Sequence, residues 1–164
     1  MKTLFRMIAL FTLLFCISSC GDDDEVAPES MEVNYANIAG TWRLTEWNGE
    51  KIDEPRYSYI TFNRKAEDGK RAFMMYTNLN SAVSERVSGA FNLGINDDSK
   101  DIISGTYDYT LSTNDGWEHI YVITGLDDKL MIWTAEDDAE EVRVYTRCGE
   151  VPADIVVGTR AVSH

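Results

Sequence analysis

The sequence contains few of the residues that most enzymes and metal sites use. Its 164 residues include only two histidines, His119 and His164, so a histidine-rich zinc site is excluded. There is no Gly-x-Ser-x-Gly nucleophile elbow and no glycine-rich phosphate loop. We interpret His119 as a strand residue, with a Ser–His–carboxylate relay as the minor alternative. We therefore predict that the protein is not an enzyme and holds neither a cofactor nor a metal ion.

Basic residues are also scarce. The chain has 15 Lys and Arg residues against 28 Asp and Glu residues, which gives a formal net charge of −13. This charge would repel a polyanion, so nucleic acid is excluded as a partner. The acidic runs at residues 96–101 and 136–141 offer oxygen ligands, but neither has the spacing of a calcium-binding EF-hand loop. We predict that both are solvated turns between strands.

The sequence has only one long hydrophobic run, at residues 7–17, and this run is too short to span a bilayer comfortably. Lys2 and Arg6 precede it and small polar residues follow it, which is the pattern of a secretory signal peptide. We therefore assign residues 1–19 to a signal peptide.

The end of this segment, Ile17-Ser18-Ser19-Cys20, resembles the lipobox of bacterial lipoproteins. The resemblance implies that Cys20 is the lipid attachment site, bearing acyl chains such as palmitate that anchor the protein to a membrane. The alternative is an ordinary signal peptide with a coincidental cysteine. With Cys16 removed and Cys20 acylated, Cys148 is alone, so an intramolecular disulfide is excluded and we predict an inert, structural thiol.

Residues 20–36 are predicted to form an acidic, flexible tether. Its first residues, Gly21-Asp22-Asp23-Asp24-Glu25, resemble the acidic export signal of lipoproteins that reach the outer face of the outer membrane. A plain acidic linker is the alternative. We therefore expect an outer-membrane protein that is lipid-anchored and faces the cell exterior.

Residues 37–148 form the predicted folded domain, in which polar and apolar residues alternate with a period of two. In one segment, Ile60 and Phe62 share one face while Tyr59 and Thr61 share the other, as in a half-buried strand. Eight strands are predicted, at residues 41–48, 57–64, 71–78, 84–93, 102–111, 118–125, 129–135 and 141–148.

Asn, Asp and Gly residues separate these strands and favour tight hairpin turns. The connections are too short for crossover helices, so consecutive strands should pair antiparallel. The predicted fold is all-β: a compact eight-stranded antiparallel up-and-down barrel, with a β-sandwich as the alternative. Residues 149–164 form a C-terminal tail, in which residues 155–157 could add a strand.

The first strand opens with Gly40-Thr41-Trp42, which resembles the Gly-x-Trp motif of the lipocalins. The resemblance covers residues 38–148 and is nearest to the compact lipocalin-like domains of secreted bacterial lipoproteins. It implies that Trp42 closes the barrel floor and that an arginine of the last strand packs across it. Arg143 and Arg147 are the candidates, and Arg147 is preferred because it lies nearer the strand end.

Aromatic residues and methionines occur in most of the predicted strands, and half of them should point into a barrel. An incompletely filled interior would form a pocket for a small apolar or amphipathic molecule. The candidate lining residues are Tyr59, Phe73, Met75, Phe91, Tyr107, Tyr121 and Trp133. The alternative function is a filled barrel that acts as an interaction module for a surface protein or a glycan.

Overall fold

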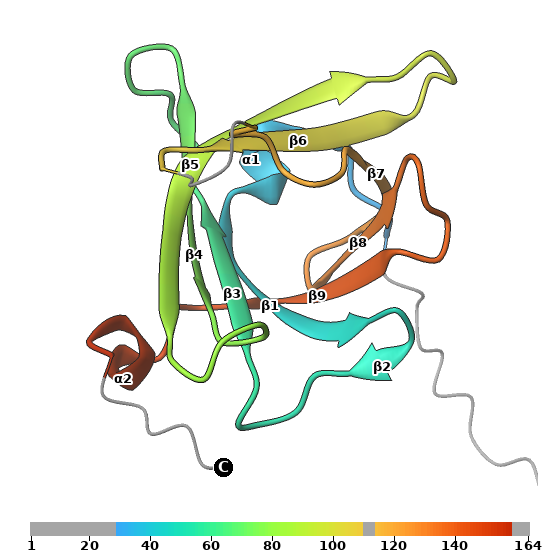
Figure 1. The fold of residues 1–164 in the computed structure, drawn as a ribbon. Helices are drawn as coiled ribbons and strands as arrows, with labels where there is room; N and C mark the ends of the chain where they lie inside the picture. The colour runs from blue at the N-terminus through green and yellow to red at the C-terminus, as the bar shows by residue number, and fades with distance from the viewer. Residues whose placement is uncertain (1–28, 110–113, 159–164) are drawn as a thin grey trace, which may run out of the picture.

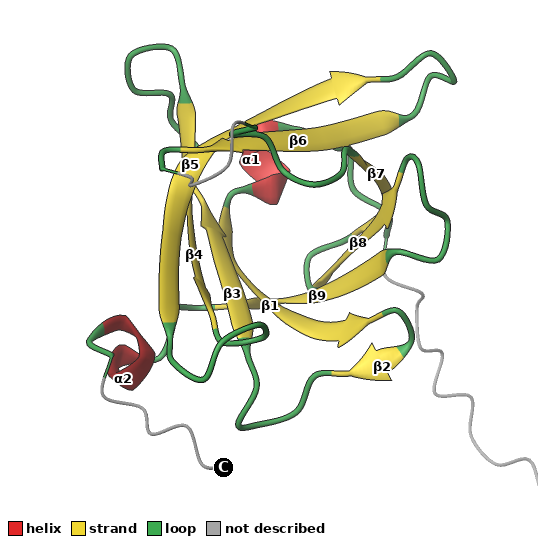
Figure 2. Ribbon diagram, in the orientation of Figure 1, coloured by secondary structure: helices red, strands yellow, loops and turns green. Residues whose placement is uncertain are grey.

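The folded part of the chain is a single closed sheet. The computed structural model describes residues 29–109 and 114–158, and strands predominate among them (Figure 2). The strands are β1 (Gly40–Trp47), β2 (Glu50–Lys51), β3 (Ser58–Phe62), β4 (Arg71–Thr77), β5 (Glu85–Ile95), β6 (Asp101–Tyr107), β7 (Tyr121–Leu126), β8 (Leu130–Ala135) and β9 (Val142–Cys148). Two four-residue helices, α1 (Tyr35–Ile38) and α2 (Ala153–Val156), complete the described elements.

The sheet is an antiparallel up-and-down barrel. Its strand order is β2-β1-β3-β4-β5-β6-β7-β8-β9, and β1 also pairs with β9, which closes the sheet. Since β2 is only a two-residue ribbon on the end of β1, the closed barrel has eight strands. Figure 1 shows these strands as a ring with α1 inside its outline. The prediction of an eight-stranded up-and-down barrel is confirmed, and the β-sandwich alternative is wrong.

All eight predicted strands are present, but β6 ends at Tyr107 and not at residue 111, and β7 begins at Tyr121 and not at residue 118. His119 lies in a bend before this strand, so its interpretation as a strand residue is wrong. The reason is that the preceding segment pairs with β6: the Trp117 amide donates to the Gly105 carbonyl at 2.8 Å. This pairing places Trp117 in the barrel interior, and β7 begins four residues later, at Tyr121.

The segment before the barrel is more ordered than the predicted flexible tether. The Met31 amide donates to the Leu126 carbonyl at 2.8 Å, and Met31, Val33 and Tyr35 pack against the core. The side chain of Asn34 caps α1 by accepting from the amides of Ala36 and Asn37. The tether prediction is therefore wrong for residues 31–36, because Met31, Val33 and Tyr35 are partly buried against the core.

The C-terminal tail does not add a strand over residues 153–156, which form α2 instead. Ile155 of this helix is buried against Tyr57 and Tyr59 on the outside of the barrel wall. The predicted signal peptide, Cys20, the acidic run at residues 21–25 and His164 lie outside the described residues. Within the described ranges, no helix has the length and apolar character needed to cross a bilayer.

One end of the barrel is closed by α1, Trp42 and Arg147. The Trp42 indole donates to the Ile38 carbonyl at 2.8 Å, and the Arg147 guanidinium lies 4.0 Å from the centroid of the Trp42 rings. Arg147 also donates to the carbonyls of Ala39 (2.8 Å) and Asn37 (2.5 Å). These contacts satisfy carbonyl groups that a four-residue helix cannot pair internally.

Gly40, the glycine of the Gly-x-Trp motif, is required by this closed end. Its φ angle is +118°, which L side chains rarely adopt, and a Cβ atom would lie 3.0 Å from Nη1 of Arg147. The glycine therefore lets the chain turn from α1 into β1 directly beneath the guanidinium group.

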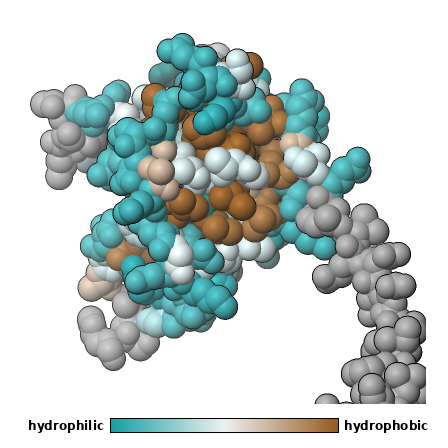
Figure 3. All heavy atoms as spheres, turned by 90° about the vertical axis from the view of Figure 1, so that its right-hand side faces the viewer, coloured by the Kyte–Doolittle hydropathy of each residue, from teal (hydrophilic) through white to brown (hydrophobic). Residues whose placement is uncertain are grey.

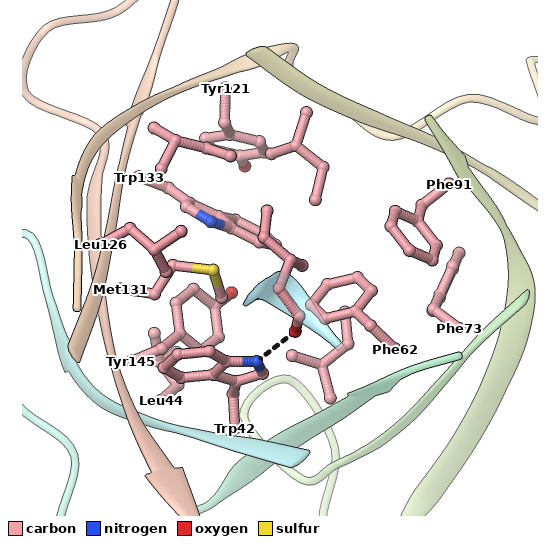
Figure 4. Close-up of a cluster of buried hydrophobic side chains, with 14 of the residues drawn as sticks. Trp42, Leu44, Phe62, Phe73, Phe91, Tyr121, Leu126, Met131, Trp133 and Tyr145 are labelled. Carbon is pink, nitrogen blue, oxygen red and sulfur yellow. Dashed lines mark hydrogen bonds between the residues drawn. The ribbon is translucent and has the colours of Figure 1, made fainter. Parts of the chain in front are cut away.

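Large hydrophobic side chains fill the interior next to this closed end (Figure 4). Phe62 and Phe91 pack with ring centroids 4.7 Å apart, and the Trp133 and Tyr145 rings are also 4.7 Å apart. Trp133 and Tyr145 also border a pocket at the opposite end of the barrel.

Along β7, β8 and β9, side chains that point into the barrel alternate with side chains that point outward. Val122, Ile132 and Val144 point outward there, beside threonines that include Thr124 and Thr134. Figure 3 views this side and shows hydrophobic and neutral residues in the middle, bordered by hydrophilic ones.

Candidate functional site

The end of the barrel opposite α1 contains a pocket of about 190 Å³. It lies where β1 and β6 end and where β9 begins, and Trp47, Tyr107 and Arg143 line it. A cavity of about 150 Å³ in another protein holds benzene. The volume here therefore suits a single ring with a short substituent and not a long lipid.

Five of the seven predicted lining residues line this pocket. Phe73 and Met75 come from β4, Tyr107 from β6, Tyr121 from β7 and Trp133 from β8. They share the pocket because the alternation along each strand points them inward.

The other two predicted lining residues, Tyr59 and Phe91, lie elsewhere, so their assignment to the pocket is wrong. Tyr59 points outward and is buried beneath α2 with Tyr57. Phe91 points inward but packs on Phe62 and Tyr35 at the closed end. β3 is buried on both of its faces, because α2 covers its outer side, so alternation alone does not identify the inward one.

Trp117 is a pocket residue that the sequence analysis missed. It comes from the loop between β6 and β7, and its ring packs on Trp133 (5.6 Å between centroids, 29° between planes) and edge-on against Phe73 (5.3 Å). A Cβ atom on Gly105 would lie 2.2 Å from the Trp117 ring, so only glycine allows this approach. A single residue in a loop has no periodic neighbours, and the sequence therefore carries no signal for it.

Trp133 is at the centre of the aromatic cluster. Its ring centroid lies 5.4 Å from that of Tyr121 and 4.7 Å from that of Tyr145. The residue is only 1% exposed, and among the described residues its indole N–H has no hydrogen-bond acceptor. Leaving such a donor unsatisfied costs about 1–3 kcal/mol. Trp133, a lining residue of the pocket, therefore carries a buried N–H group without an acceptor.

Arg143 brings positive charge to the pocket and is held by Glu141. Its Nε donates to Glu141 Oε1 at 2.8 Å. The Trp47 indole donates to both carboxylate oxygens (2.9 and 2.8 Å), and the Asn48 amide donates to Oε2 at 3.0 Å. The guanidinium carbon also lies 5.1 Å from the Trp47 ring and 4.9 Å from the Tyr121 ring. These contacts fix one edge of the arginine.

The pKa values of Glu141 and Arg143 keep both groups charged at neutral pH. Burial alone would raise the pKa of Glu141, but hydrogen bonds from Trp47, Asn48 and Arg143 hold it below its ordinary value. Burial opposes the charge of Arg143, yet Tyr145, Tyr121 and Glu141 raise its pKa.

Three tyrosines complete the polar side of the pocket, namely Tyr107, Tyr121 and Tyr145. Burial raises the pKa of each, although the positive charge of Arg143 works in the opposite direction. Their hydroxyl groups therefore stay protonated at neutral pH and can donate hydrogen bonds.

The other residues considered for chemistry lie apart from this pocket. His119 pairs with the Asp137 carboxylate (Nδ1 to Oδ1, 2.7 Å), and its hydrogen bond lowers the pKa of Asp137. Cys148 is a free thiol whose Sγ contacts the Thr41 carbonyl, and burial raises its pKa, which disfavours the reactive thiolate. Over residues 29–109 and 114–158, three or more His, Cys, Asp or Glu side chains nowhere cluster as metal ligands.

The contact between Trp117 and Gly105 can be tested by substitution. Gly105→Ala should destabilise the fold by about 1–3 kcal/mol, because the added methyl group overlaps the indole ring. Tryptophan fluorescence should also shift to the red as Trp117 moves toward water. Gly94→Ala is the matched control, since its Cβ would meet Ile102 at an ordinary 3.6 Å. Equal stability of the two variants would contradict this placement of Trp117.

The Glu141 pair predicts a pH-dependent stability. A carboxyl group whose pKa is lower in the folded state stabilises the protein above the unfolded pKa, here about 4.5, and loses this effect as the pH falls through the folded value. Glu141→Gln should therefore reduce the free energy of unfolding at pH 7, and the difference from the parent should shrink at pH 3. Urea unfolding at both pH values measures this effect. The exposed Glu140→Gln is the control, and a deficit that persists unchanged at pH 3 would refute the prediction.

Comparison with known proteins agrees with this architecture. The family model of the lipocalin-like domain matches residues 38–133, from the last residue of α1 to Trp133 in β8. Neither the curated proteins nor the solved structures include a match to the chain. A lipocalin-like barrel is typically a binding fold without catalysis, and this chain belongs to the lipocalin-like domain family.

Proposed function

We propose that the barrel binds a small apolar or amphipathic molecule in the pocket at its open end. The observation that carries this proposal is the pocket of about 190 Å³, which is lined by aromatic side chains and a few polar groups. Binding sites for small molecules typically combine apolar walls with a few placed polar groups. Membership of the lipocalin-like family supports the same conclusion.

A wholly filled barrel, the alternative predicted from the sequence, fits this arrangement less well. Side chains fill the closed end around Trp42 and Phe62, but the region between Tyr107, Trp117 and Arg143 retains a volume open to a ligand. Binding of a surface protein or a glycan stays a prediction from the sequence, and it would not involve the pocket.

The proposal also places the protein at the outer membrane, anchored by lipid on Cys20 and facing the cell exterior. The support is the sequence pattern, with a charged start, a short apolar run, small residues before Cys20 and an acidic run after it. The anchor would keep the binding domain at a surface where small molecules are encountered.

Native mass spectrometry of the gently purified chain tests ligand binding. We expect a non-covalent adduct with the mass of a small molecule, lost on denaturation. Met75→Trp should reduce the adduct because it fills the pocket, whereas Ile95→Trp, on an exposed position of β5, should not. An adduct that is unaffected by Met75→Trp would show that the ligand binds elsewhere.

The anchor is tested separately by Cys20→Ala. Without the thiol no acyl chains can be attached, so the variant should move from the membrane fraction to the soluble fraction, and labelled palmitate should no longer be incorporated. Cys148→Ala is the matched control and should stay with the membrane. If the Cys20 variant still fractionated with the outer membrane, the lipoprotein assignment would be wrong.

A further inference from the structure

The pocket has a polar side that is rich in hydrogen-bond donors. Arg143 contributes a guanidinium group, and Tyr107, Tyr121 and Tyr145 contribute hydroxyl groups. The opposite side carries Phe73, Met75 and other apolar groups. A molecule that complements this pocket therefore has an acceptor at one end and an apolar body at the other.

The geometry of Arg143 indicates which kind of acceptor fits. A guanidinium group has five N–H donors, and Glu141 takes the one on Nε. The two terminal amino groups remain, and Tyr145 lines the pocket together with the arginine. The side chain is 24% exposed and lines the pocket. The paired amino groups match the two oxygens of a carboxylate, which arginine binds in a bidentate manner.

The negative charge of the chain does not prevent an anion from binding here. The Debye length is about 8 Å at physiological ionic strength, so charges farther than this from the pocket are largely screened. Glu118 is the carboxylate at the edge of the pocket, and it is exposed to solvent. Glu141 accepts a hydrogen bond from Nε of the arginine, and Trp47 and Asn48 donate to the same carboxylate, so a ligand would meet the terminal amino groups of Arg143.

We infer that the ligand is a small aromatic carboxylic acid, with its carboxylate on the terminal amino groups of Arg143 and its ring against the pocket wall formed by Phe73, Met75 and Trp117. The volume of about 190 Å³ limits the molecule to one ring and a short chain. This inference rests on the proposed binding function and adds the chemical class of the ligand.

Calorimetric titration with a matched pair of probes tests the inference. The probes are 3-phenylpropanoate and 3-phenylpropanamide, which share size and shape but differ in charge. At pH 7.5 the acid should bind the unaltered protein about tenfold more tightly than the amide, because a carboxylate forms charge-assisted hydrogen bonds with arginine.

Variants of Arg143 then assign the effect to this residue. Arg143→Gln should remove the preference for the acid and change the affinity for the amide less than twofold, and Arg143→Lys should restore part of the preference. Arg86→Gln, an exposed position on the outside of β5, is the matched control and should leave both affinities unchanged. If Arg143→Gln does not fold, the Lys variant and the unaltered protein still give the comparison.

The outcomes separate this inference from the proposed function. Equal binding of acid and amide to the unaltered protein would overturn the inference but leave small-molecule binding in the pocket intact. A preference for the acid that survives in Arg143→Gln would place the carboxylate away from Arg143 and also overturn it. Binding of neither probe would overturn the inference, and the adduct in the native mass spectrum would then decide the proposed function separately.

Discussion

The stacking of Arg147 on Trp42 is the interaction on which the pocket depends. The same guanidinium group donates to two carbonyls at the end of α1. Arg147 of β9 therefore holds α1 and β1 together at the closed end. An eight-stranded barrel has an interior just wide enough to be filled by side chains. This end is filled around Trp42, whereas a pocket remains at the other end, where Trp117 enters from a loop and packs over Gly105.

β9 supplies an inward-facing arginine to each end of the barrel. Every second residue of this strand points inward, namely Arg143, Tyr145 and Arg147. The interior must therefore accommodate two positive charges. At the closed end, two backbone carbonyls and a tryptophan face satisfy Arg147. At the open end, Glu141 neutralises Arg143 through Nε only. The two ends differ because α1 covers only one of them. The end of α1 provides carbonyl acceptors for Arg147, whereas Arg143 lines the pocket.

Alternation in the sequence was sufficient to predict the barrel because nearly every strand has one buried and one exposed face. It failed where a second layer covers the sheet, since α2 buries Tyr59 on the outer side of β3. A four-residue helix is too short for a periodic signal, so α2 could not be predicted. The site was predicted only in part for a related reason. The sequence pointed to Arg143 only as a candidate partner of Trp42, whereas the packing shows that it lines the pocket, and Trp117 belongs to a loop.

The direction of the pocket follows from where the chain enters the barrel. Met31 bonds to Leu126, the last residue of β7, and β7 starts with Tyr121 in the pocket wall. The chain therefore joins the barrel at the closed end, next to α1. The mouth of the pocket therefore lies at the end of the barrel opposite the point where the preceding segment attaches. The small volume and the charged wall of the pocket suit a water-soluble acid better than a membrane lipid.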